Sequence, residues 1–160
     1  GRNMRSCMIW IKTALIVCIV LFVAWMLMSG ESESDADVGA VEAAVASVGL
    51  GSMKKSDDLT VKKVFGINAG DYEGVVYYKG EGIMDVNELL IVKLKSVSQA
   101  SDVKKAAQNR LDEQIKNFTN YGTDQIDLLN QGVVVSRGNY VFYTVSENSD
   151  KLKSAFVGAL

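Results

Sequence analysis

Residues 88–95 read ELLIVKLK, and this stretch predicts the central strand of a β-sheet. Successive side chains of an extended chain point to opposite faces of a sheet. Here Leu90, Val92 and Leu94 fall on one face, and Leu89 and Ile91 on the other. A strand that is apolar on both faces has to be covered on both sides. We therefore expect a sheet centred on this segment, with further strands beside it and helices above and below.

Three other stretches predict the remaining strands. Residues 72–79, YEGVVYYK, are rich in the β-branched and aromatic residues that are typical of strands. Residues 133–136 and 139–146 flank the dipeptide Arg137-Gly138, a short turn that predicts a β-hairpin. The second arm of this hairpin, NYVFYTVS, is apolar on both faces, so it is also expected to be central.

Helices are expected between these strands. The longest runs from about Ser98 or Ser101 to Asn120, because its apolar residues recur at spacings of three and four, and Ser101 is its expected N-cap. The other expected helices are 38–48, 56–65 with an N-cap among its first three residues, 123–129 with Thr123 as N-cap, and 148–160 with Asn148 or Ser149 as N-cap. The element order is thus ααββααββα. The simplest arrangement is an α+β fold with a four-stranded antiparallel sheet in the order 1-2-4-3.

The N-terminal part predicts a membrane anchor. Residues 13–28, TALIVCIVLFVAWMLM, carry no charge, and a transmembrane helix over 9–30 has about the 20 residues that a bilayer requires. Arg2, Arg5 and Lys12 precede this run and acidic residues follow it, so the positive-inside rule places residues 1–12 in the cytoplasm as a tail. We expect a single-pass signal anchor in the cell membrane, an acidic tether at 31–37 and an extracytoplasmic domain at 38–160.

A cleaved signal peptide is the alternative reading of the same apolar run. Cleavage needs small residues at the −3 and −1 positions, and Leu27 or Met28 would occupy the −3 position. This pattern favours an uncleaved anchor.

Composition excludes several kinds of chemistry in the domain. The chain has no histidine, and both cysteines, Cys7 and Cys18, precede the domain. Nucleophilic triads that use histidine, and zinc sites that need imidazole or thiolate, are therefore excluded. No cofactor or metal is expected. The domain is nearly neutral and has no basic block, so nucleic acid is not an expected partner.

Two short motifs fit the S-x-x-K pattern of serine acyl-enzymes. They are Ser52-Met53-Lys54-Lys55 and Ser101-Asp102-Val103-Lys104. The companion S-D-N and K-T-G elements are missing, and about one match is expected by chance in a chain of this composition. We interpret both motifs as accidental.

The loop after residue 79 gathers oxygen ligands that suit a hard cation such as calcium. These ligands are Glu81, Asp85, Asn87 and Glu88. Their spacing does not follow the calcium-loop pattern D-x-D-x-D-G-x5-E, so a solvated loop is the preferred interpretation.

Aromatic residues provide the candidate ligand surface. Tyr77, Tyr78, Tyr121, Tyr140, Phe142 and Tyr143 could line a groove for a peptide or a glycan. Contiguous exposed rings in the structure would support this hypothesis.

A family resemblance rests on four segments between Glu88 and Phe156. They are the strand ELLIVKLK, the helix VKKAAQNRLDEQIKNF, Tyr121-Gly122 with Gln125, and Gly138-Asn139-Tyr140-Val141. In this combination the chain, over about residues 72–156, resembles the bacterial family called domain of unknown function 4358. The resemblance implies a small extracytoplasmic domain tethered to the membrane, with no established activity. The candidate interaction residues are Tyr78, Tyr121, Gln125, Asn139 and Tyr140.

The sequence thus favours a non-catalytic binding or interaction module at the cell surface, whose partner is a protein or a component of the cell envelope. Two alternatives stay open. One is an envelope enzyme that uses carboxylates or a Ser/Lys pair, and the other is an accessory subunit of a membrane complex.

Overall fold

The computed structural model describes residues 2–28 and 33–160. These residues form two compact units, residues 1–32 and Glu33–Leu160. The first contains α1 (Arg2–Met28), a helix in which an 18-residue window within Asn3–Ala24 has a mean hydropathy of 2.6. None of the residues Asn3–Ala24 is buried. Residues 9–28 of the expected membrane span lie within this helix, and its last two residues, 29 and 30, lie outside the described part of the chain.

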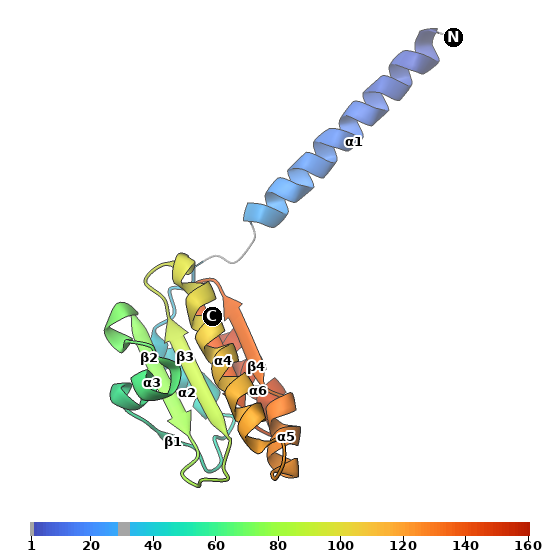
Figure 1. Ribbon diagram of the computed structural model, residues 1–160. Coiled ribbons are helices and arrows are strands. Elements are labelled where there is room, and N and C mark those ends of the chain that lie inside the picture. Colours follow the sequence, from blue (N-terminus) through green and yellow to red (C-terminus); the bar gives the residue numbers. More distant parts are fainter. Residues whose placement is uncertain (1, 29–32) are drawn as a thin grey trace. The chain divides into compact units, whose positions relative to one another are not determined.

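The second unit holds the remaining elements (Figure 1). In chain order they are α2 (Val38–Ala46), β1 (Lys54–Lys55), α3 (Asp58–Phe65), the 3-10 helix η1 (Ala69–Asp71), β2 (Gly74–Lys79), β3 (Glu88–Lys93), the 3-10 helix η2 (Val97–Gln99), α4 (Ala100–Phe118), α5 (Thr123–Asn130), β4 (Val133–Arg137), β5 (Tyr140–Val145) and α6 (Ser149–Ala159).

The sheet is antiparallel, with the strand order β1-β2-β3-β5-β4. The four expected strands keep their relative order, but the expected count of four is wrong because β1 adds a fifth strand at the edge beside β2. This strand pairs Lys54 with Lys79 and Lys55 with Tyr78. A two-residue strand made of exposed lysines carries no apolar alternation, so no periodicity in the sequence could reveal it.

Helices cover both faces of the sheet, and each face has its own core. On one face α3, α4 and α5 pack on one set of strand residues that includes Leu90 and Tyr143. On the other face α2 and α6 pack on the alternate set, which includes Ile91 and Phe142. All six residues of β5 are buried, which confirms that it is a central strand. Burying a single large apolar side chain stabilises a fold by roughly 1.5–3 kcal/mol.

Some helix ends agree with those expected from the sequence, and others differ. Asp57 caps α3 through the Thr60 amide, as expected, and Gly66 ends that helix in the left-handed conformation with φ of 71°. Ser101, by contrast, lies inside α4, because the chain turns earlier at a capping box formed by Ser96 and Gln99. Thr123 is the first residue of α5 rather than its cap, and the N-cap position belongs to Gly122.

The domain begins before the boundary expected at residue 38. Asn139 binds Ser34 twice, accepting from its amide at 2.7 Å and donating to its carbonyl at 3.1 Å. The Tyr140 hydroxyl donates to the Ala36 carbonyl. Residues 33–37 of the expected tether are therefore part of the folded unit, and its first two residues, 31 and 32, lie outside the described residues.

Candidate functional site

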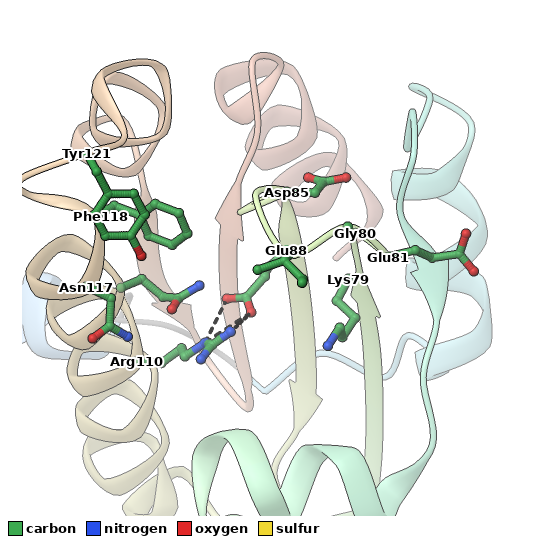
Figure 2. A pocket seen from close by; sticks show the side chains of 12 residues that line it. Lys79, Gly80, Glu81, Asp85, Glu88, Arg110, Asn117, Phe118 and Tyr121 are labelled. Atoms are coloured by element: carbon green, nitrogen blue, oxygen red, sulfur yellow. Dashed lines mark hydrogen bonds and ion pairs between the residues drawn. The ribbon is translucent and has the colours of Figure 1, made fainter.

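A polar pocket of about 460 Å³ lies between the β2–β3 connection and the C-terminal half of α4 (Figure 2). Its residues come from the end of β2, the loop that follows, the start of β3, and α4 with the corner after it. The lining residues are Lys79, Gly80, Glu81, Gly82, Ile83, Asp85, Glu88, Arg110, Gln114, Asn117, Phe118 and Tyr121.

Glu88 and Arg110 form an ion pair at the inner end of this pocket (Figure 2). The Arg110 Nε lies 3.0 Å from Oε1 and 3.2 Å from Oε2 of Glu88. Two tyrosine hydroxyls complete the network, since Tyr77 donates to Oε1 and Tyr143 donates to Oε2, each at 2.8 Å. Both oxygens of the buried Glu88 carboxylate thus accept hydrogen bonds from Arg110 and from a tyrosine. Proteins accommodate an interior charge by pairing it and hydrogen-bonding it in this way.

The positions of these two residues follow from the periodicity of their elements. Glu88 begins β3 on the same face as Leu90, so it points toward α4. Arg110 follows the buried Ala107 by three residues, so it lies on the side of α4 that faces the sheet.

Burial and charge shift the pKa values of this network. Burial disfavours the charged form of Arg110, but the hydrogen bonds and the charge of Glu88 outweigh it and raise the pKa of the guanidinium. Burial and the adjacent Glu88 carboxylate raise the pKa of Tyr77 and of Tyr143. Both phenols therefore stay protonated as hydrogen-bond donors, and neither is suited to act as a base at neutral pH.

The other two acids of the pocket are also engaged. Asp85 accepts hydrogen bonds from the Ser52 hydroxyl at 2.5 Å and from the amide and side chain of Asn87. Burial alone would raise the pKa of Asp85, yet these hydrogen bonds lower it overall. Glu81 pairs with Lys54 at 3.0 Å.

Lys79, Gln114 and Asn117 differ from these acids. Among the described residues, no protein group forms a hydrogen bond or ion pair with the side chain of any of these three. They give the pocket one ammonium group and two amide groups that are open to a ligand. Sequence reasoning did not single out these residues, because nothing in their local spacing separates them from a solvated helix face or a strand end.

The five candidate interaction residues are not brought together in one place. Tyr121 is 65% exposed, lines the pocket and packs on Phe118 with ring centroids 5.4 Å apart. Gln125 donates to the Met84 carbonyl at 3.1 Å, which fastens the β2–β3 loop to α5. Tyr78 donates to Glu42, so it joins β2 to α2.

Asn139 and Tyr140 lie away from the pocket residues and hold residues 34 and 36 on the domain, as described above. Of the five candidates, Tyr121 therefore lines the pocket directly and Gln125 supports its loop.

The hypothesis of an aromatic groove is wrong. Tyr77, Tyr140, Phe142 and Tyr143 are each 1% exposed or less, so they belong to the two cores. Aromatic strand residues bury a large apolar area, and a sheet covered on both faces leaves them no route to solvent.

The structure also clarifies the expected cation loop and the S-x-x-K motifs. No group of three or more acidic, histidine or cysteine residues is arranged to hold a metal within residues 2–28 and 33–160. Ser52 donates to Asp85, and Lys55 pairs with Glu42 at 2.8 Å, so this motif does not form a Ser/Lys pair.

Comparison with known families gives one match. The sequence model described as Domain of unknown function (DUF4358) matches residues 46–146, which include β1 to β5 and every residue that lines the pocket. The match begins earlier and ends earlier than the span of 72–156 expected from the resemblance. Comparisons with curated proteins and with solved structures give no match.

Proposed function

This chain belongs to the DUF4358 family, a domain of unknown function, and from that premise we propose that it is a non-catalytic binding module carried on the outer side of the cell membrane by α1. The observation that carries the proposal is the presence, in one chain, of an apolar helix with no buried residue over Asn3–Ala24 and a separately packed domain with an open polar pocket.

The helix supports the membrane part of the proposal. Its apolar stretch of 22 residues, Asn3–Ala24, is about the length that crosses a bilayer, and the domain cores do not use it. Arg2, Arg5 and Lys12 lie in the N-terminal half of α1 and acidic residues follow it, and this distribution of charge favours an outward-facing domain.

The pocket supports binding over catalysis. General base catalysis needs a titratable group that is free to take a proton near neutral pH. Glu88, Asp85 and Glu81 are each engaged with partners in the protein, and the nearby tyrosines Tyr77 and Tyr143 have raised pKa values. The groups left open, an ammonium and two amides, are suited to recognition.

The experiment is cysteine labelling with a membrane-impermeant maleimide in intact cells. Leu59 is 75% exposed on α3 and does not line the pocket, so Leu59→Cys in a chain with Cys7→Ser and Cys18→Ala reports on the domain. The matched control keeps Cys7 and carries only Cys18→Ala. We expect the domain cysteine to be labelled in intact cells, and Cys7 only after permeabilisation. The reverse pattern would overturn the proposed topology.

A further inference from the structure

The chemistry left open in the pocket specifies a class of ligand, and this inference rests on the binding function proposed above. The starting point is the charge balance. Arg110 is neutralised by Glu88, and Glu81 by Lys54. Lys79 has no acidic partner among the described residues. Asp85 is the remaining acid, and its carboxylate is occupied by three hydrogen bonds from Ser52 and Asn87.

Arg110 adds a second donor beside Lys79. Its Nε and Nη2 bind Glu88, but Nη1 has no hydrogen-bond partner in the part of the chain that the structure describes. No described side-chain nitrogen or oxygen is both buried and unsatisfied, so Nη1 is accessible to solvent. In the view of Figure 2 the Lys79 ammonium and the Arg110 guanidinium both lie below Gly80, Lys79 at the end of β2 and Arg110 on α4.

This pair of donors suits a singly charged carboxylate. Lys79 is the one cation of the pocket lining that has no ion-pair partner among the described residues. Asp85, whose hydrogen-bond donors are all neutral, keeps its negative charge in the same lining, so the pocket offers one unpaired ammonium but no net positive charge. A phosphate monoester carries roughly 1.5 to 2 negative charges at neutral pH, so part of its charge would stay unpaired. A carboxylate carries a single charge, and it accepts hydrogen bonds from an ammonium and from a guanidinium edge.

The neighbouring side chains indicate what the carboxylate is attached to. Gln114 and Asn117, one turn apart on α4, each offer an amide that can both donate and accept, which matches the N–H and C=O of a peptide bond. Tyr121 and Ile83, 65% and 97% exposed, provide an apolar rim for side chains. The volume of about 460 Å³ lies within the range of roughly 300–1,000 Å³ for small-ligand pockets.

We infer that the pocket binds the C-terminal end of a peptide, with the terminal carboxylate between Lys79 Nζ and Arg110 Nη1, the last peptide bonds on Gln114 and Asn117, and an apolar side chain on Tyr121 and Ile83.

The test uses the full chain in detergent micelles, labelled with ¹³C at the isoleucine methyl groups. The Ile83 methyl, assigned with Ile83→Val, reports on the pocket. The probes are a pool of N-acetylated tripeptides with free C-terminal carboxylates, the same pool as C-terminal carboxamides, and sodium phosphate alone. We expect the free-acid pool to shift the Ile83 signal in a saturable way, and the carboxamide pool to bind at least about tenfold more weakly, because charge-assisted hydrogen bonds are lost.

Variants test where the carboxylate binds. Lys79→Gln should weaken binding of the free-acid pool by at least about tenfold. The spectrum of the unbound variant should stay unchanged, because Lys79 has no partner in the described residues. Lys151→Gln, an exposed lysine on α6, is the matched control and should bind as the original chain does.

Four outcomes would overturn the inference. They are equal shifts from both peptide pools, no shift from either pool, unchanged binding in Lys79→Gln, and a shift from phosphate with none from the free-acid pool. Each of these leaves the cysteine-labelling result untouched, so a failure of ligand class is distinguishable from a failure of the proposed topology.

Discussion

Glu88 is the residue that joins the sheet to α4. A buried carboxylate loses its hydration, which costs several kcal/mol unless charged and polar partners replace the water. Arg110, Tyr77 and Tyr143 are those partners. Both tyrosine rings make T-shaped contacts with Phe65, at centroid distances of 5.1 and 5.8 Å. The hydrogen-bond network that stabilises the core around Glu88 therefore also holds Arg110 in its position in the pocket.

Replacing Glu88 should destabilise the domain far more than replacing another acid of the same pocket. Glu88→Gln leaves the Arg110 charge partly buried without its counter-ion, and we expect a loss of about 3 kcal/mol in the free energy of unfolding. Urea titration followed by near-ultraviolet circular dichroism measures this, because all six tyrosines lie in the domain whereas both tryptophans lie in the N-terminal helix.

Glu81→Gln is the matched control. Glu81 and its partner Lys54 have side chains that are 66% and 69% exposed. Exposed pairs contribute little, so the change should stay within about 0.5 kcal/mol. Equal effects of the two substitutions would show that the Glu88 network does not stabilise the domain.

Alkaline pH should destabilise the domain through its tyrosines. Burial, together with the hydrogen bond to Glu42 and its charge, raises the pKa of Tyr78 to about 12. An unfolded tyrosine has a pKa of about 10. Because the folded pKa is the higher one, the stabilising contribution of Tyr78 is fully present below pH 10 and is lost as the pH rises through about 12.

Tyrosinate absorbance and near-ultraviolet circular dichroism, recorded together from neutral to alkaline pH, test this expectation. Tyr78→Phe should reduce the loss of stability over that range, since it removes one of the groups that titrate. An unchanged alkaline profile in that variant would contradict the assignment.

At the scale of elements, the sequence predicted the helices and strands in which the apolar pattern is long enough to repeat. β3 and β5 carry apolar residues on both faces, and the register pairs Leu90 with Tyr143 and Ile91 with Phe142, as two central strands require. Two errors arose where a short local signal was overlooked or absent. Ser96-Val97-Ser98-Gln99 has the spacing of a capping box, so the true start of the α4 region was readable. The sequence carries no comparable signal for β1, because this two-residue strand forms only by pairing with the edge of β2.

The pocket was predictable only in part. A carboxylate at Glu88, on the same strand face as Leu90 and Val92, requires a buried partner. Arg110 falls on the apolar face of its helix with Ala107 and Val103. These two features together could have indicated the ion pair, but the sequence analysis considered Glu88 only as a possible cation ligand and did not single out Arg110. The sequence does not predict that the side chains of Lys79 and Asn117 lack hydrogen-bond partners, because this depends on which groups lie near them in the folded chain.

The segment before α2 gives a prediction at the element scale. Asn139 binds both backbone groups of Ser34, and Asn139→Ala removes both hydrogen bonds. We expect the local opening of this segment to cost about 1–2 kcal/mol less, which gives faster amide exchange at Ser34 and little change in β3 and β5. Hydrogen exchange read by mass spectrometry measures both effects. Unaltered exchange at residues 33–37 would mean that the segment is held by other contacts.

At the scale of the whole molecule, the two units are built on different principles. The domain buries its apolar residues in two cores on either side of the sheet, where Phe142 stacks on Phe156 at 4.7 Å. Over Asn3–Ala24 no residue of α1 is buried, although this stretch is strongly apolar. Such a helix is stable where its surroundings are as apolar as its side chains, which is the interior of a bilayer.

Removal of α1 should therefore leave the domain folded. A chain of residues 33–160 keeps both cores and the Asn139–Ser34 contact, and we expect it to give the near-ultraviolet circular dichroism of the full chain and to remain in the soluble fraction. The full chain should stay with the membrane after an alkaline carbonate wash. The comparison chain, residues 38–160, lacks the hydrogen bonds made by Ser34 and Ala36, and it should unfold with about 1–3 kcal/mol less free energy. If residues 33–160 prove unfolded while the full chain is folded, then α1 contributes to the domain itself and the division into two independent units is wrong.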